Sequence, residues 1–328
     1  MSRVIRWGIL GTGGIARAFA AALMDTPDAL LAAVGSRSID NARAFAADFG
    51  SPACYGSYQE LAAASDIDII YIGTPHPLHA SNAMLALEAG KAVLCEKPFT
   101  MNLREAEQVV TRAREKKLFL MEARWTRFMP ALAAVRRIID AGTIGVVSQV
   151  HADFGFSATR DPEHRVNKRE LGGGALLDLG IYPLSISCAL LGPVASVQAQ
   201  AVLSDGGVDL TTGWSMKHVS GAMSICSCSL RARTPSELTV SGTLGSVRMD
   251  AMFHLAKTVT LTLGDGVKRT IDTPFLGNGY VHEAIEAGRC LRAGLTESPQ
   301  MMHDDTLALM KLLDTIRTQI GVNYPADD

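Results

Sequence analysis

Short apolar runs alternate with amphipathic helical patterns over the first 121 residues of the chain. The expected strands are residues 3–10, 29–36, 67–73, 91–95 and 118–121, with a short extended piece at 54–55. The expected helices are residues 14–24, 39–49, 78–89 and 103–116, and one more that begins at Ser57. Near-continuous apolar strands separated by amphipathic helices are typical of a parallel sheet that is covered on both faces. The pattern therefore predicts a doubly wound α/β domain at the N-terminus.

The pattern changes after an expected helix at residues 130–142. Successive strands are expected at residues 146–156, 194–203, 208–217, 221–230, 236–241, 247–253, 258–263 and 267–272. The expected helices among and after them begin near Gly174, at residues 280–293, and at Pro299 with Ser298 as N-cap, the last running to Ile320. Strands that follow each other through short turns favour a large, mostly antiparallel open sheet in an α+β domain. We expect the domains to span residues 1–122 and 123–328, with the boundary at 121–128.

The bulk composition fits two globular domains and excludes some classes of partner. The chain has 328 residues, 48% hydrophobic and 20% charged, and a net charge of −2. This nearly neutral net charge does not favour binding to nucleic acid or to a membrane surface. No apolar run is expected to approach the ~20 residues that cross a bilayer. Six cysteines without CxxC spacing and scattered histidines predict buried thiols and no metal site, and we expect a cytoplasmic protein.

A glycine turn follows the first expected strand and opens the first helix. Its residues are Gly11, Thr12, Gly13, Gly14 and Ile15, with the small Ala16 next. In a dinucleotide site the first glycine permits the tight turn, the second leaves the backbone open to the pyrophosphate, and the helix N-terminus attracts the negative charge. The turn predicts a cofactor site in a Rossmann domain.

The second expected strand ends at Ser36, Arg37 and Ser38. An NAD site usually places an acid there to bind the ribose 2′-hydroxyl, and this chain has none. The Arg37 guanidinium can pair with a 2′-phosphate, and the two serine hydroxyls can donate hydrogen bonds. The sequence therefore favours NADP over NAD.

Further polar side chains follow the later strands, where ligands of open α/β sheets bind. The expected cofactor contacts among them are Thr74, His76 and His79 after one strand, Glu96 and Lys97 after the next, and Trp125 and Arg127 after the last. Lys97 precedes Pro98, which can hold the turn that directs the lysine toward the cofactor. The expected roles of His76 and His79 differ, since His79 is also suited to support the next helix.

Three motifs together resemble the glucose-fructose oxidoreductase and inositol dehydrogenase (Gfo/Idh/MocA) family over essentially the whole chain. They are the glycine turn, Glu96-Lys97-Pro98, and the segment 172–183, which reads GGGALLDLGIYP. Segments 92–98 and 119–128 are similar to those of the dimeric dihydrodiol dehydrogenases and NADP-dependent D-xylose dehydrogenases. The resemblance implies an NADP-type cofactor and hydride transfer to or from a sugar or diol carbon. It also implies that Lys97, Asp178 and Tyr182 line the catalytic site.

Many family members carry His at the position of Tyr182 and Asn at that of His76, and this chain departs from them. We therefore expect Tyr182 to be the general acid/base, with the Lys97 ammonium lowering the pKa of its phenol. Asp178 lies four residues before Tyr182, on the same helical face, and is expected to orient the lysine or a substrate hydroxyl. Arg165 is a further candidate substrate contact.

Two other functions remain as alternatives. A non-catalytic nucleotide-binding sensor or scaffold of the same fold would not need Lys97 and Tyr182, and a methyltransferase would not need the Glu96-Lys97-Pro98 turn. The expected partners are a small sugar or diol and a second copy of the chain. We expect a homodimer through the second sheet, because its strands place apolar residues on both faces and the helices are too few to cover it.

Overall fold

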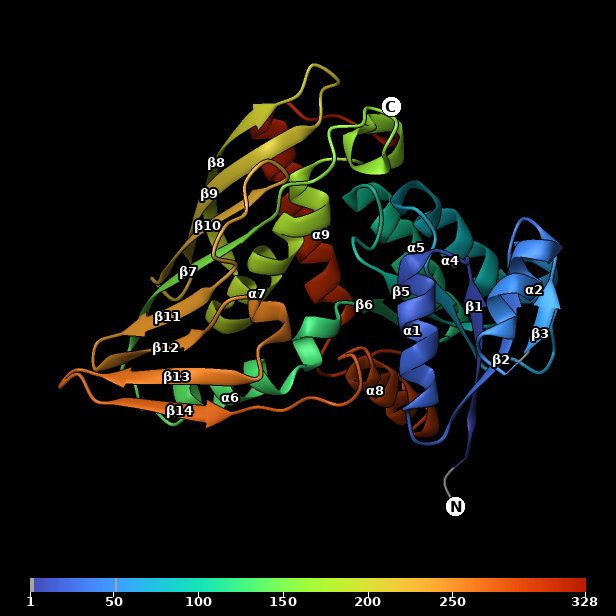
Figure 1. Ribbon diagram of the computed structural model, residues 1–328, viewed down its shortest axis with the longest axis horizontal. Helices are drawn as coiled ribbons and strands as arrows, with labels where there is room; N and C mark the ends of the chain where they lie inside the picture. Colours follow the sequence, from blue (N-terminus) through green and yellow to red (C-terminus); the bar gives the residue numbers. More distant parts are fainter. Residues whose placement is uncertain (1–2, 51) are drawn as a thin grey trace. The chain divides into compact units, whose positions relative to one another are not determined.

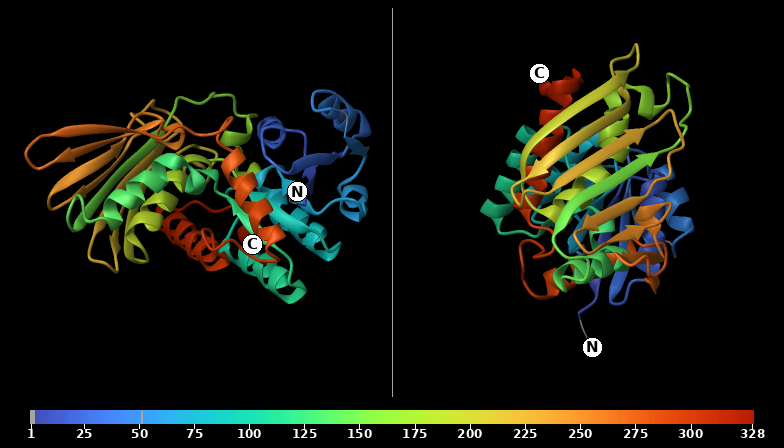
Figure 2. Two further views of the ribbon diagram at one scale, coloured as in Figure 1. Left: turned by 90° about the horizontal axis from the view of Figure 1, so that it is seen from below. Right: turned by 90° about the vertical axis from the view of Figure 1, so that its left-hand side faces the viewer.

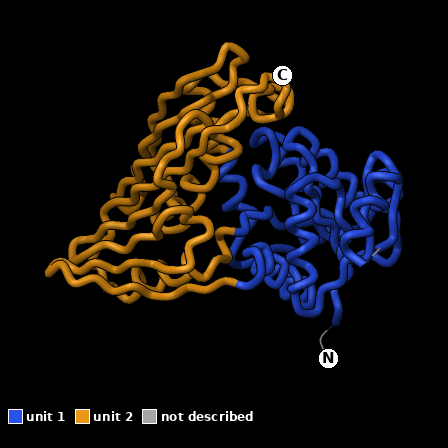
Figure 3. Tube along the Cα trace, viewed as in Figure 1, with its two compact units in different colours: residues 1–125, 276–310 blue, residues 126–275, 311–328 orange. Residues whose placement is uncertain are grey.

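The computed structural model describes residues 3–50 and 52–328, which form two compact units (Figure 3). Unit 1 contains Met1–Trp125 and Leu276–Met310, and unit 2 contains Thr126–Phe275 and Lys311–Asp328. The chain first passes from unit 1 to unit 2 between Trp125 and Thr126, within the expected boundary region of residues 121–128. The division differs from two continuous domains because residues 276–310 return to unit 1, where helix α8 (Val281–Arg292) packs against α1 (Gly14–Met24).

Unit 1 contains a six-stranded sheet in the order β3-β2-β1-β4-β5-β6, with every pair parallel. The strands are β1 Ile5–Leu10, β2 Ala29–Gly35, β3 Ala53–Tyr55, β4 Ile69–Ile72, β5 Ala92–Glu96 and β6 Leu120–Ala123. The connecting helices are α1, α2 Ile39–Ala47, α3 Tyr58–Ala63, α4 His79–Glu88 and α5 Leu103–Lys116 (Figure 1). This confirms the predicted doubly wound parallel sheet.

The local sequence explains why these elements form. Every residue of β4 and β5 is buried, as expected for central strands covered on both faces. Helix α5 buries one stripe of small and β-branched residues that includes Ala106 and Val110, spaced four apart. Its N-cap is Asn102, whose side-chain oxygen accepts a hydrogen bond from the Glu105 N–H at 3.0 Å.

Unit 2 contains an eight-stranded sheet in the order β14-β13-β12-β11-β7-β10-β9-β8. Only the pair β7 and β10 is parallel among the described pairs, which confirms a mostly antiparallel sheet. The strands are β7 Val147–Gly155, β8 Val194–Leu203, β9 Asp209–His218, β10 Met223–Ser229, β11 Leu238–Gly242, β12 Gly245–Met249, β13 Thr258–Leu263 and β14 Lys268–Asp272. Helix α6 (Pro130–Asp140) packs against β12 and β13, and α7 (Ile181–Leu191) packs against β7 and β10.

Among the described residues of unit 2, no helix covers the other face of this sheet, as the right-hand view of Figure 2 shows. Its outward positions on paired strands are largely polar, for example His151 opposite Thr239 and Arg248 opposite Thr260. Met223 and Ile225, the exposed positions of β10, are apolar exceptions, 40% and 44% exposed. The expectation of apolar residues on both faces therefore holds for β10 and not for the other outward positions named here. The expected shortage of helices on this face is found within unit 2.

Two helix starts differ from the expected ones. Helix α9 (His303–Ile320) begins four residues after Pro299, because Ser298 opens a turn: its hydroxyl accepts from the Gln300 N–H at 3.1 Å, and its carbonyl accepts from the Met301 N–H at 3.0 Å. The same hydroxyl donates to Glu286 Oε1 at 2.5 Å. The helix expected near Gly174 begins as a π-helical turn, Leu176–Gly180, that leads directly into α7.

The helical segment Arg169–Leu191 is long and apolar enough to cross a membrane by length and composition alone. It corrects the expectation that no apolar run approaches that length. In the structure 78% of its most apolar window is buried inside the protein, as in the core helix of a globular domain.

Candidate active site

The glycine turn joins β1 to α1 at the carboxyl edge of the parallel sheet. Gly11 has φ +106°, and a Cβ atom there would lie 3.0 Å from the Gly73 carbonyl oxygen. Only glycine suits that position, because the conformation is strained for other residues and the space is taken by the next loop. Thr12 and Ile15 are half-buried beside it, and Ala16 is buried against the sheet.

The N-terminus of α1 offers open space for an anion. Gly13 and Gly14 are exposed, and a Cβ atom at Gly14 would meet nothing within 4 Å. The N-cap Gly13 supplies no side-chain hydrogen bond, so the first N–H groups of α1 need a partner from outside the helix. The turn thus fits a dinucleotide pyrophosphate, which the helix end would attract.

The three polar residues that follow β2 differ in burial and in hydrogen bonding. Ser36 is buried, and its N–H donates to the Tyr55 carbonyl at 3.2 Å. Ser38 caps α2 by accepting from the Asn41 N–H at 3.4 Å, which leaves its own hydroxyl proton available to a ligand. Arg37 is exposed, and it makes no ion pair with any of residues 3–50 and 52–328. A guanidinium without an acid beside it suits an added phosphate.

The loop after β4 is tied to the loop after β5 by His79. The ring is fully buried, with Nδ1 2.8 Å from the Pro98 carbonyl and Nε2 2.8 Å from the Thr74 carbonyl. Burial lowers the pKa of His79. With both nitrogens bound inside the protein, His79 is placed to position the two loops rather than to touch a cofactor itself. His76, 7% exposed, lies edge-to-face with it at 5.7 Å between ring centroids.

Lys97 follows β5, and its peptide bond to Pro98 is cis. The preceding Glu96 is buried: its Oε1 accepts from the Tyr71 hydroxyl at 2.6 Å, and its Oε2 accepts from the Lys97 N–H at 3.1 Å. Burial raises the pKa of Glu96 to about 7, although the Tyr71 hydroxyl and the Lys97 charge oppose the rise. Glu96 is thus held inside the protein, where it fixes the backbone of Lys97.

A second buried carboxyl lies near Glu96 and was not expected from the sequence. Glu283, on α8, is 0% exposed, and neither of its carboxyl oxygens has a hydrogen-bond partner among the described residues. Burial and the neighbouring Glu96 raise its pKa well above the ordinary range. The sequence of α8 alone does not indicate that Glu283 lies near another carboxyl, because Glu96 is on β5, far away in the sequence.

Trp125 and Arg127 follow β6. Trp125 is 3% exposed, and its ring centroid lies 4.7 Å from that of Tyr280 within unit 1. Arg127 is half-buried and belongs to unit 2. The two residues expected to line one crevice thus belong to different units.

Unit 2 brings together two of the expected catalytic and substrate residues. The Arg165 guanidinium donates to both carboxylate oxygens of Asp178, at 3.3 and 3.2 Å. Asp178 is 8% exposed and lies in the π-helical turn just before α7. Tyr182, in the first turn of α7, is half-buried, with its ring centroid 5.3 Å from that of Phe154 on β7. Lys97 belongs to unit 1, so its pairing with Tyr182 remains a prediction.

No group of three or more His, Cys, Asp or Glu side chains that could hold a metal ion is found in residues 3–50 and 52–328.

Comparison with known proteins identifies the family over both units. Residues 5–123 match the NAD-binding Rossmann fold of the Gfo/Idh/MocA oxidoreductase family, and residues 132–248 match the Gfo/Idh/MocA C-terminal domain. Trans-1,2-dihydrobenzene-1,2-diol dehydrogenase of Danio rerio is 38% identical over 335 residues, which cover 98% of this chain and 99% of that protein. The enzyme of the same name from Mus musculus is 36% identical with the same coverage.

Solved structures show the same fold over the full length. The 3-ketoreductase KijD10 from Actinomadura kijaniata, in complex with NADP and TDP-benzene, superimposes with a TM-score of 0.86 at 27% identity, covering 98% of this chain and 99% of that one. Aldose-aldose oxidoreductase from Caulobacter crescentus, complexed with glycerol, gives 0.89 at 26% identity, covering 97% of each chain. The chain therefore belongs to the Gfo/Idh/MocA family of NAD(P)-dependent oxidoreductases.

Proposed function

We propose that the protein is an NADP-dependent dehydrogenase or reductase that acts on the CH–OH carbon of an aldose or of a cyclic or vicinal diol. The observation that carries the proposal is the edge of the parallel sheet, where the glycine turn and Lys97 follow strands of one sheet that end on the same side. The relatives' names support the substrate class, since they are dehydrogenases of a dihydrodiol and an oxidoreductase of aldoses.

The preference for NADP is supported by Arg37. It stands exposed at the end of β2 without an acidic partner among the described residues. In this proposal the pyrophosphate binds at Gly13 and Gly14 and the 2′-phosphate at Arg37, with Ser38 donating its hydroxyl proton. The KijD10 complexes with NADP are consistent with this choice.

In the proposed mechanism, Tyr182 removes the hydroxyl proton of the substrate in the oxidative direction and returns it in the reductive one. An ordinary tyrosine pKa near 10 makes the phenolate scarce at neutral pH, and the Lys97 ammonium favours the phenolate. The hydrogen bonds from Arg165 fix the Asp178 carboxylate just before the start of α7. The bound cofactor supplies the acceptor or donor of the hydride.

An assay of the purified protein with each cofactor tests this function. Aldoses that include D-xylose, and cyclic and vicinal diols, are offered with NADP or NAD, and formation of the reduced nicotinamide is followed by absorbance. The proposal predicts turnover of at least one of these substrates with NADP preferred. NADP binding without turnover of any substrate, in either direction, would favour the sensor or scaffold function instead.

The location and the assembly belong to the same proposal. All six cysteines are free thiols, which suits a reducing cytoplasm. The open face of the sheet in unit 2 is the surface through which we propose a homodimer.

A further inference from the structure

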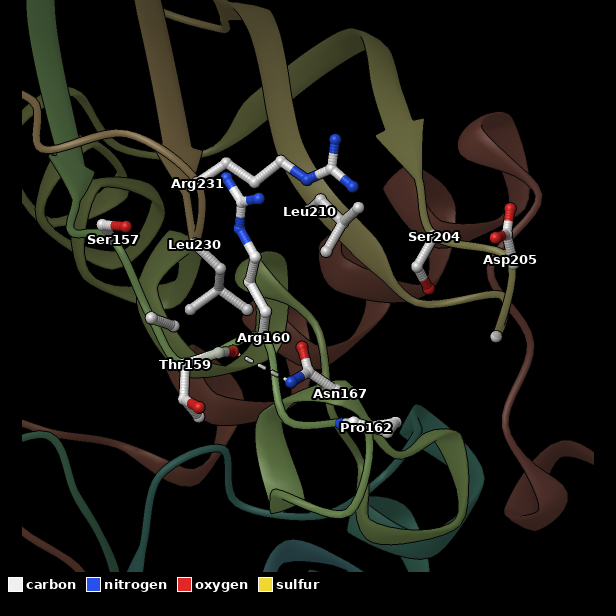
Figure 4. Close-up of a pocket in the computed structure, with 12 residues that line it drawn as sticks. Ser157, Thr159, Arg160, Pro162, Asn167, Ser204, Asp205, Leu210, Leu230 and Arg231 are labelled. Atoms are coloured by element: carbon white, nitrogen blue, oxygen red, sulfur yellow. Dashed lines mark hydrogen bonds between the residues drawn. The ribbon is translucent and has the colours of Figure 1, made fainter.

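A pocket of about 410 Å³ lies within unit 2. It is bounded by the loop after β7, the turn between β8 and β9, and the chain just after β10 (Figure 4). Lys97, Asp178 and Tyr182 are not among its lining residues. Its volume is within the range of small-molecule sites.

Two arginines give this pocket its charge. Arg160 and Arg231 are exposed lining residues, and neither forms an ion pair with any residue in 3–50 or 52–328. The other cations of the same loop do have carboxylate partners: Arg165 binds Asp178 at 3.2 Å, and Lys168 binds Glu163 at 2.5 Å. Arg160 and Arg231 therefore bring to the pocket positive charge that no ion pair among the described residues neutralises.

The walls are held by hydrogen bonds, so the pocket is formed without a ligand. The Ala158 N–H donates to the Leu230 carbonyl at 2.9 Å, which joins the loop to the end of β10. The Asn167 side-chain amide donates to the Thr159 and Asp161 carbonyls at 3.0 and 2.7 Å, which closes the loop on itself. A prepared site loses less conformational entropy when it binds.

The lining groups define the chemistry of a ligand. Two guanidinium groups match a phosphate monoester, which carries a charge of about −1.5 to −2 at pH 7. The pocket is much larger than a phosphate group, and its other polar groups, which include those of Ser157, Thr159 and Ser204, suit hydroxyl groups. Figure 4 shows Ser204 and Asp205 on the side of the pocket opposite Ser157 and Thr159. Asp205 can accept hydrogen bonds from ligand hydroxyls there, and it opposes additional negative charge.

We propose that this pocket is a second small-molecule site that binds the phosphate ester of a polyhydroxylated compound, with the phosphate held by Arg160 and Arg231. The site is independent of the proposed reaction, because binding there requires neither the cofactor nor Tyr182.

Calorimetric titration of the full chain tests the proposal with three probes: glucose 6-phosphate, ribose 5-phosphate and glycerol 3-phosphate. Glucose and inorganic phosphate serve as the separate halves of the ligand. We expect at least one phosphate ester to bind at least about tenfold more tightly than either half. Arg160→Gln and Arg231→Gln are each expected to weaken its binding about tenfold.

Two matched variants separate the pocket from general surface charge. Arg233→Gln removes an exposed arginine near Arg231 that does not line the pocket, and we expect it to leave Kd unchanged. Asp205→Asn removes the opposing charge, and we expect it to tighten phosphate-ester binding, a gain that misfolding cannot produce. The proposal is overturned by absence of binding of all three esters, by equal binding of inorganic phosphate, by an effect of Arg233→Gln as large as that of Arg231→Gln, or by unchanged or weaker binding in Asp205→Asn.

Discussion

Glu96→Gln should make the stability of unit 1 less dependent on pH. The amide has nearly the shape of the carboxylate, and it can keep both hydrogen bonds: its oxygen accepts from the Lys97 N–H, and its NH₂ group donates to the Tyr71 hydroxyl oxygen. The substitution therefore removes the titration of Glu96 and preserves its bonding.

The magnitude follows from the pKa of Glu96, about 7 in the folded protein against an ordinary value of 4.5. Because the folded chain holds the proton more tightly, unfolding releases it between these pH values, and the free energy of unfolding falls as pH rises from 4.5 to 7. Each pKa unit is worth about 1.4 kcal/mol, so the full loss is about 3 kcal/mol. Below pH 4.5 both states are protonated and this loss disappears.

Urea unfolding at several pH values between 4.5 and 8 measures the effect, followed by the fluorescence of tryptophans that include the buried Trp7 and Trp125 of unit 1. We expect the unfolding free energy of Glu96→Gln, relative to the parent, to rise by about 3 kcal/mol across this range. Glu107→Gln, an exposed glutamate of α5, is the control and should run parallel to the parent. Parallel curves for Glu96→Gln and the parent would refute a raised pKa at Glu96.

Three further outcomes are expected. Arg37→Ala should reduce the preference for NADP over NAD by roughly 10- to 150-fold, the value of a hydrogen bond to a charged group, and an unchanged ratio of the two dissociation constants would contradict this. Glu96→Gln should lower the pKa of Glu283, because the neighbouring carboxyl can no longer ionise, and carboxyl NMR titration that finds the same pKa would remove Glu96 from the pair. Light scattering at micromolar concentration should give twice the chain mass of 34.9 kDa, whereas a monomer would exclude the proposed dimer.

The periodicity of apolar positions predicted both sheets because burial on one or two faces leaves a regular trace in the sequence. Helix starts were less predictable. A proline such as Pro299 suits a first helical turn, yet Ser298 opens a separate turn and accepts from the Gln300 N–H there. Its hydroxyl also donates to Glu286, a contact between residues 12 apart that no local pattern contains. The helix expected near Gly174 was found, but the apolar pattern does not distinguish its π-helical first turn from an α-helical one.

Some residues of the candidate site could likewise be predicted from the sequence, and others could not. Gly11, Arg37 and Lys97 could be singled out because each follows a strand that ends at the ligand-binding edge. The partners that hold such residues come from elsewhere: Tyr71 reaches Glu96 from the neighbouring strand, and Glu283 approaches it from α8. Such tertiary contacts depend on how strands and helices pack, so motif spacing alone does not reveal them.

The central claim is that Tyr182 carries the substrate proton with the help of Lys97, and the kcat of Tyr182→Phe tests it most directly. Removal of a positioned proton carrier usually costs about 10²–10⁴ in rate, so kcat should fall by that order while NADP affinity stays near that of the parent. Lys97→Met should also lower kcat and shift the basic limb of the pH profile upward, and the two losses should not add. If Tyr182→Phe keeps more than about a tenth of the parent kcat, with hydride transfer shown to be rate-limiting by a deuterium isotope effect, Tyr182 is not the acid/base of this enzyme.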